Sequence, residues 1–328
     1  MKLTSALILS AISIAGLAAC GGSSNPNNQP PVLALLKFDS TNAIAAAGVA
    51  SEAALESADI GGVTDFTDPT PTAEAGVDKS GPVFAATSLA QETLGASVSF
   101  IPVPATTSPC AVSGSVTVSG DLADLATFTA GDVITVDSDM CDDGTGQVVD
   151  GLLEMEITSF EGDILTSEFL FGVELALTDF MVTESNETTT ANGNVGTTID
   201  TRTPPIVEGS VFGDRFSVTG MGITETIINF STIYTEDSSA FPVGWTTDSI
   251  GTVDSSEIAG AITYETMVEF EGSGEGYPYT GELLVTGADN STLYLITIDD
   301  TNVQIDADYD GDGIIDETLN LTWVELEG

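Results

Sequence analysis

Apolar and polar residues alternate along most of the chain after residue 110, in short runs separated by Gly, Asp and Asn. The alternation is clearest at Leu153, Met155 and Ile157, whose neighbours Glu154 and Glu156 are charged. This period of two gives a strand one dry and one wet face. Strands are predicted at Ser113–Ser119, Val133–Asp137, Val148–Phe160, Thr166–Thr183, Thr188–Thr201, Val207–Thr219, Thr224–Thr235, Ile262–Gly272, Gly281–Gly287, Thr292–Asp299, Asn302–Ala307 and Thr318–Val324.

No helical pattern long enough to form a crossover separates these segments, which argues against parallel βαβ units. Residues 110–328 are therefore predicted to form one antiparallel β domain. The fold class that we expect is mainly β. It is an antiparallel meander that forms an open barrel or a sandwich, with a short N-terminal helix.

Residues 32–109 are rich in Ala and are predicted to form a helical and loop segment. Ser40–Ser57 (STNAIAAAGVASEAALES) is predicted as a helix that Ser40 or Thr41 caps, although Gly48 weakens it. Val83–Leu94 fits either a second short helix or a strand. The residues expected near one face of the first helix are Ile44, Ala47 and Leu55.

The chain begins with Met1-Lys2 and an apolar run that is too short to span a bilayer comfortably. Leu17-Ala18-Ala19-Cys20 then follows. This stretch resembles the lipobox of bacterial lipoproteins, in which a branched residue and two small residues precede a cysteine that becomes lipidated. The alternative is an ordinary secretory signal with a cysteine at its boundary by chance.

The resemblance implies a signal peptide over 1–19 and acyl chains, such as palmitate, on Cys20. Gly21 after the cysteine implies sorting to the outer membrane of a Gram-negative bacterium. Residues 20–31 are Gly-, Asn- and Pro-rich and are interpreted as a flexible tether. The expected protein is held on the membrane by its N-terminal lipid and faces the periplasm or the cell surface.

Cys110 and Cys141 remain once Cys20 is assigned to lipid. An even pair in an exported protein most simply forms a disulfide. On the chain-entropy account this bridge stabilises the fold by roughly 3–4 kcal/mol. Two buried free thiols are the alternative.

Asp306 to Glu317 reads DADYDGDGIIDE, in which carboxylates alternate before two glycines. Oxygen ligands at this spacing are those that Ca²⁺ prefers. Two frames fit. A loop that starts at Asp306 matches the EF-hand spacing, with Gly311 sixth and Glu317 twelfth. A loop that starts at Asp308 is favoured because both flanks are predicted as strands.

The second frame resembles the DxDGDGxxD calcium loops of integrin-type, thrombospondin-type and bacterial envelope repeats. That resemblance implies carboxylate ligands from Asp308, Asp310, Asp312 and Asp316 and a backbone carbonyl from Ile314. One structural Ca²⁺ is therefore expected, and a purely solvated acidic hairpin tip is the alternative. Trp245, Tyr277, Tyr279 and Trp323 are interpreted as packing residues, with an aromatic platform for sugars as the less favoured reading.

The chain of 328 residues carries 51 acidic and 5 basic side chains and no histidine, with a formal net charge of −46. Such a charge repels a phosphate backbone, so nucleic acid is excluded as a partner. The absence of histidine excludes Ser-His-Asp and Cys-His catalysis. We nominate no catalytic residue and no organic cofactor.

The favoured function is therefore a lipid-anchored cell-envelope protein, a structural or binding β module stabilised by one calcium ion. Its partner, whether an envelope protein, a lipid or a glycan, is not identified by the sequence. A carboxylate-dependent envelope hydrolase acting on glycans is one alternative. A transmembrane β-barrel is a second, although the acidic residues between apolar positions count against it.

The charge predicts that added salt stabilises the fold. Repulsion among carboxylates destabilises the compact chain, and the Debye length falls to ~3 Å at 1 M salt. The thermal midpoint is expected to rise as NaCl increases at constant pH, as measured by circular dichroism. A midpoint that stays constant or falls over this range would contradict the expectation.

Overall fold

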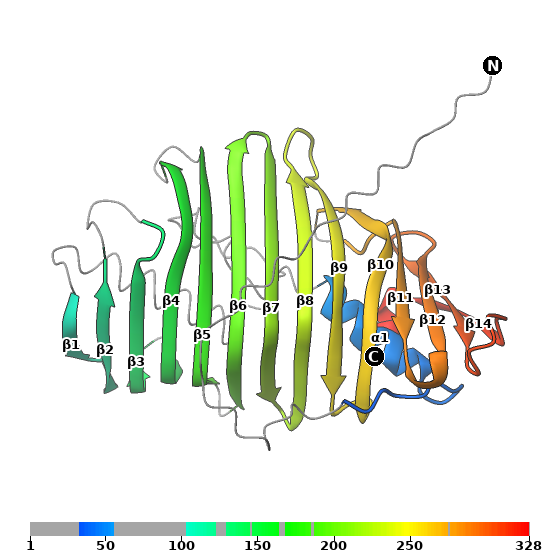
Figure 1. Ribbon diagram of the computed structural model, residues 1–328, viewed down its shortest axis with the longest axis horizontal. Coiled ribbons are helices and arrows are strands. Elements are labelled where there is room, and N and C mark those ends of the chain that lie inside the picture. Colours follow the sequence, from blue (N-terminus) through cyan, green and yellow to red (C-terminus); the bar gives the residue numbers. More distant parts are fainter. Residues whose placement is uncertain are drawn as a thin grey trace, which may run out of the picture. The chain divides into compact units, whose positions relative to one another are not determined.

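The computed structural model describes residues 33–55, 103–122, 129–144, 146–163, 168–184, 187–274 and 276–327 (Figure 1). It shows fourteen strands in one antiparallel sheet whose spatial order is the sequence order, β1 to β14. The predicted mainly β meander with a short N-terminal helix is confirmed. The described strands form one open sheet that is not closed into a barrel.

Each strand pairs only with its neighbours in the sequence, so β1 and β14 are the two edges. The strands are β1 (Val103–Pro109), β2 (Ser113–Asp121), β3 (Val133–Asp142), β4 (Gln147–Asp163), β5 (Glu168–Glu184), β6 (Glu187–Thr203), β7 (Ile206–Gly220), β8 (Ile223–Asp237), β9 (Gly244–Ser255), β10 (Gly260–Ser273), β11 (Thr280–Thr286), β12 (Thr292–Thr297), β13 (Asn302–Asp308) and β14 (Glu317–Thr322). Three further elements are α1 (Ala43–Leu55), the short 3₁₀ turn η3 (Ala288–Asn290) and α4 (Trp323–Glu327).

The apolar side chains of the strands form two clusters, one on β3 to β8 and one on β9 to β13. Ile227 of the first cluster pairs directly with Val253 of the second, so both clusters lie on the same face of the sheet. Leu153, Met155 and Ile157 are buried on this face, as their alternation predicts. We call it the inner face, and we call the opposite, polar face the outer face.

Helix α1 packs on the inner face against β9 and β10 (Figure 1). The turn just before it is held by a reciprocal pair: the Asp39 carboxylate accepts from the Thr41 N–H, and the Asn42 side chain accepts from the Asp39 N–H. Neither Ser40 nor Thr41 is therefore the cap that the sequence predicts. Ile44 is 38% exposed, contrary to expectation, because small residues form the buried face instead: Ala43, Ala46, Ala47, Gly48, Ala50, Ala53 and Ala54.

The C-terminal end of α1 is bound to the sheet by side-chain hydroxyls. Ser249 of β9 donates to the carbonyl of Ala54 at 2.6 Å, and the Tyr264 phenol of β10 donates to that of Ala53 at 3.4 Å. The last carbonyls of a helix have no partner within the helix, so these bonds satisfy them. Burial raises the pKa of Tyr264, which keeps its hydroxyl protonated as a donor.

The segment before α1 is bound to the sheet by backbone hydrogen bonds. Leu35 forms a parallel bridge with Ala261 at the start of β10. The Ala288 N–H of η3 donates to the Leu36 carbonyl at 2.8 Å. Lys37 forms an ion pair with Asp289 of η3 at 3.1 Å. The chain therefore reaches α1 through contacts to β10 and η3.

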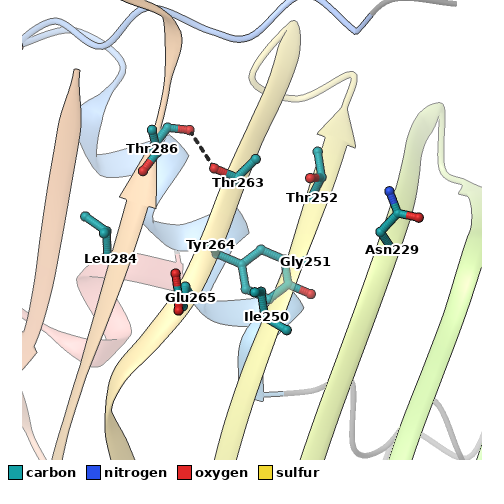
Figure 2. A pocket seen from close by; sticks show the side chains of 9 residues that line it. All are labelled: Asn229, Ile250, Gly251, Thr252, Thr263, Tyr264, Glu265, Leu284 and Thr286. Carbon is teal, nitrogen blue, oxygen red and sulfur yellow. Dashed lines mark hydrogen bonds between the residues drawn. The ribbon is translucent and has the colours of Figure 1, made fainter. Parts of the chain in front are cut away.

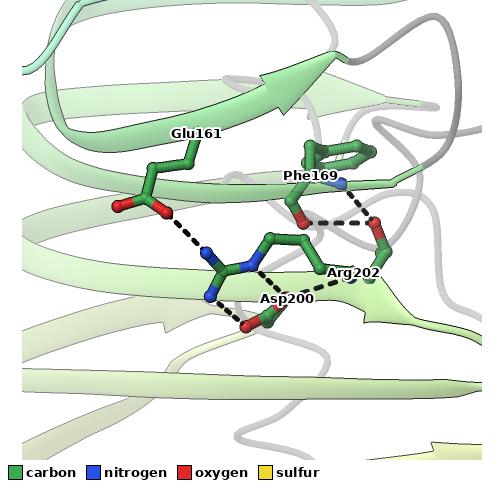
Figure 3. Close-up of polar contacts among 5 residues, drawn as sticks. Glu161, Phe169, Asp200 and Arg202 are labelled. Atoms are coloured by element: carbon green, nitrogen blue, oxygen red, sulfur yellow. Dashed lines mark hydrogen bonds and ion pairs between the residues drawn. The ribbon is translucent and has the colours of Figure 1, made fainter.

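Two further features connect strands that do not pair with each other. Cys110 and Cys141 form the expected disulfide, which joins the β1–β2 connection to β3. Arg202, at the end of β6, donates to Asp200 on its own strand and to Glu161 on β4 (Figure 3). The hydrogen bond from Arg202 lowers the pKa of Asp200. Because the ion pair is largely exposed, its contribution to stability is about 0–1 kcal/mol.

The structure differs from the sequence prediction at three places. The sheet begins at Val103, before the domain boundary expected at residue 110. Strand β9 was not predicted, and the segment expected to remain a strand to Val324 turns into α4 at Trp323.

The predicted signal peptide, tether, Cys20 modification and Val83–Leu94 element lie outside the described residues. No described helix is both long enough and apolar enough to cross a membrane.

Gly48 explains how closely α1 approaches α4, because a Cβ atom there would lie 2.7 Å from the backbone oxygen of Leu326. Replacing a helix-interior Gly by Ala normally stabilises a helix by about 1 kcal/mol. We expect Gly48→Ala to destabilise the protein instead, since the clash exceeds this gain. Urea unfolding would measure the change.

Ala45 provides the control, because it is an exposed position on the same helix. Ala45→Gly should cost about 1 kcal/mol through helix propensity alone. A Gly48→Ala protein that is more stable than the unmodified chain would show that the helices do not approach this closely.

Candidate metal centre

The predicted calcium loop connects β13 and β14. Asn302 pairs with Thr322 and Ala307 with Glu317, and the loop between the strands spans residues 309–316. Both flanks are strands, as the sequence predicts, so the loop lies at the tip of a hairpin and not between two helices.

Three carboxylates converge at this tip. One oxygen each from Asp308, Asp310 and Asp316 lies within 4.8 Å of the other two. Calcium binds oxygens at 2.3–2.6 Å, so two ligand oxygens on opposite sides of one ion are about 5 Å apart. The separation of these oxygens therefore suits a shared Ca²⁺. Asp310 and Asp316 are exposed, which leaves access for an ion.

Asp308 is held in place by the loop itself and is only 3% exposed. Its two oxygens accept from the N–H groups of Gly311 at 2.8 Å and Gly313 at 2.7 Å. Burial raises the pKa of the carboxyl, but these N–H groups, with those of Asp312 and Asp310, hold the pKa below its usual value. The loop therefore favours an ionised Asp308, which is the form that binds a cation.

Asp316 is the last residue of the loop, directly before β14. Its carboxylate accepts from the Tyr309 N–H at 2.8 Å, and its own N–H donates to the Ala307 carbonyl at 2.8 Å. Each carboxylate oxygen has two lone pairs, so an oxygen that accepts one N–H still has a lone pair for a metal ion.

Asp312 and Ile314, the other two predicted ligands, belong to the same loop. The Asp312 carboxylate accepts from the Ile314 N–H at 2.8 Å and is not among the three oxygens that converge. The Ile314 side chain is 68% exposed at the hairpin tip. The geometry thus brings together three of the four predicted carboxylate ligands.

The alternative frame that starts at Asp306 is disfavoured because its end residues, Asp306 and Glu317, are not among the carboxylates that converge. Asp306 lies within β13, where it accepts from Thr318 at 2.7 Å and from Gln304 at 2.9 Å. Glu317 accepts from the Tyr309 phenol at 2.7 Å. Burial, this hydrogen bond and the charge of Glu317 raise the pKa of Tyr309, so the phenol remains a donor.

The loop packs on the β11–β12 connection. A Cβ atom at Gly311, whose φ is +74°, would lie 2.4 Å from the backbone oxygen of Asp289 in η3. Gly313 has a φ of +84° but faces open space, and it occupies the sixth position of the frame that begins at Asp308. An EF-hand-like loop needs glycine at that position for its sharp turn.

Three of the four aromatic residues that the sequence assigns to packing, Trp245, Tyr277 and Trp323, are packed, whereas Tyr279 is 47% exposed. Tyr277 stacks on Trp323 with ring centroids 5.6 Å apart and an interplanar angle of 9°. Trp323 is 1% exposed, and the Trp245 indole donates to the Gly274 carbonyl. Trp323 is therefore a core side chain and offers no open platform to a sugar.

Comparisons of the chain with protein-family models, with curated proteins and with solved structures found no significant match.

The two glycines of the loop provide a matched test of its packing. Both have positive φ, so Ala at either position should cost about 1–2 kcal/mol in backbone strain. Gly311→Ala should cost more than Gly313→Ala, because only its Cβ atom meets Asp289. Urea unfolding in EDTA measures both without bound metal. Equal losses would contradict the close contact between the loop and η3.

Proposed function

We propose that this chain is a lipid-anchored cell-envelope protein whose β domain is stabilised by one Ca²⁺ at the β13–β14 tip. The observation that carries the proposal is the convergence of Asp308, Asp310 and Asp316. All three offer hard oxygen ligands, which Ca²⁺ prefers over softer donors. Asp312 and the Ile314 carbonyl, at the fifth and seventh positions of the loop, are proposed to complete the coordination after a local rearrangement.

The lipobox-like sequence ending at Cys20 supports the anchor, together with the polar segment 20–31. Two or more acyl chains hold a protein on a membrane stably, whereas one chain binds only weakly. The high negative charge of the domain favours a spacer, because an anionic membrane surface repels it.

The position of the calcium loop also fits this role. The loop packs on η3, and η3 binds the segment 33–39 through Leu36 and Lys37. This segment is the first described part of the domain after the proposed tether. An ion in the loop would stiffen the part of the domain that is nearest to the anchor.

Calcium should raise the thermal midpoint of the full chain in a saturable way. A ligand at 100 times its Kd that binds only the folded state adds about 2.7 kcal/mol to stability. CaCl₂ is titrated into EDTA-treated protein at fixed ionic strength, with MgCl₂ in parallel. We expect a saturable shift with Ca²⁺ and a smaller one with Mg²⁺, which retains its waters more strongly.

Variants of the exposed ligands identify the site. Asp310→Asn and Asp316→Asn should abolish the calcium-dependent shift. Asp300→Asn, an exposed aspartate in the β12–β13 turn, should keep it. If calcium gives no shift at fixed ionic strength, or the same shift in all three variants, the calcium part of the proposal is wrong.

The anchor is tested by expressing the full chain in a Gram-negative host and measuring the mass of the mature protein. The expected N-terminal residue is Cys20, carrying a diacylglyceryl group and an amide-linked acyl chain. Cys20→Ser should abolish lipidation and membrane association. An unmodified Cys20, or cleavage at another residue, would disprove the anchor without affecting the calcium site.

A further inference from the structure

The pairing between β9 and β10 opens in the middle of both strands. Their ends are paired, at Val253 with Ile262 and at Thr247 with Phe270. Between these pairs, residues 248–252 of β9 face residues 263–269 of β10, so five residues lie opposite seven. The two extra residues of β10 interrupt the backbone pairing at this point, and the Ser249 N–H donates instead to the Thr266 hydroxyl at 3.0 Å.

A pocket of about 320 Å³ lies at this opening (Figure 2). A second irregularity adjoins it: the pairing of β8 with β9 shifts between Ile228 and Ser231, and Asn229 has a φ of +48°. The Tyr264 side chain closes the pocket toward α1, since it is 1% exposed and donates to the Ala53 carbonyl. Gly251 leaves room for this ring, because a Cβ there would lie 2.6 Å from the Tyr264 hydroxyl.

The pocket is lined by neutral polar groups, one carboxylate and two aliphatic side chains. Figure 2 shows the amide of Asn229 on β8, the hydroxyl of Thr252 on β9, and the hydroxyl of Thr263 and the carboxylate of Glu265 on β10. The Thr263 hydroxyl donates to the Thr286 carbonyl at 3.4 Å, which orients it. The two apolar side chains, Ile250 on β9 and Leu284 on β11, lie on either side of Glu265 (Figure 2).

This lining indicates the chemical class of the ligand. No Lys or Arg is among the described residues that line the pocket, and Glu265 repels an anion, so a phosphate or carboxylate ligand is disfavoured. Amide and hydroxyl groups both donate and accept, and a carboxylate accepts from adjacent hydroxyls. A sugar ring offers hydroxyls that can bond to the polar groups and C–H groups that can contact Ile250 and Leu284. We propose that this pocket binds one neutral hexose unit of a glycan.

The proposal is independent of the calcium loop and of the lipid anchor, because none of their residues lines the pocket. It is tested on the full chain with CaCl₂ and NaCl held constant. The probes are D-glucose, D-galactose and D-mannose, and binding is followed by saturation-transfer NMR and by chemical-shift titration. At least one hexose should bind saturably, with a Kd in the millimolar range that is usual for a small, solvent-exposed ligand.

Two pairs of variants locate the binding. Glu265→Gln removes the carboxylate and should weaken binding roughly tenfold, since hydrogen bonds to charged groups are the stronger ones. Its control, Glu282→Gln, changes an acid on β11 outside the pocket lining and should bind normally. Leu284→Trp should fill the pocket and abolish binding, whereas Ile296→Trp on β12, also outside the lining, should not.

Glu265→Gln changes a single exposed group, so it tests the proposal even if Leu284→Trp fails to fold. Saturable hexose binding that Glu265→Gln weakens and Glu282→Gln does not would support it. The proposal is overturned if none of the three hexoses binds saturably, or if Glu265→Gln and Glu282→Gln bind equally well. It is also overturned if lysine amide binds at the pocket and no hexose does, since the site would then recognise a cation.

Discussion

The alternation of side chains across the pleat is the constraint on which this structure depends. A protein with 51 acidic residues must keep its carboxylates in water while it buries enough apolar surface to fold. A strand meets both requirements, because adjacent residues such as Leu153 and Glu154 point to opposite faces, one into the core and one into water. A one-residue slip in pairing would bring the carboxylates to the inner face. The register is therefore strongly specified, and each strand pairs with the strand that follows it in the chain.

The same alternation explains which parts of the fold could be predicted. Strands with large apolar residues on the inner face, such as β4 and β5, are evident from the sequence. Strand β9 was missed because its inner positions include Thr247, Ser249 and Gly251, which carry no hydrophobic signal. Ser249 provides the hydroxyl that donates to the Ala54 carbonyl of α1, and Gly251 leaves room for the Tyr264 ring. Strand β1 was missed because of its prolines, which a strand accommodates at the edge of a sheet.

The candidate metal centre, like the fold, could be predicted only in part. The spacing of the aspartates identified the loop and its hairpin context, since both are local properties of the sequence. The sequence does not reveal that Asp308 is buried beneath two glycine N–H groups. It also does not reveal that Gly311 meets Asp289, a residue of another connection. The pocket at Tyr264 was not predicted at all, because an opening between β9 and β10 depends on how two strands of unequal length pair.

The short segment before α1 determines how the domain responds to mechanical force. The bridge between Leu35 and Ala261 is parallel, and hydrogen bonds on both sides of Ala261 connect it to Ala34 and Leu36. A force directed along this segment loads these bonds simultaneously in shear, whereas a force across it would break them one at a time. With the proposed N-terminal anchor, the domain would therefore resist extraction best when pulled along the direction of β10.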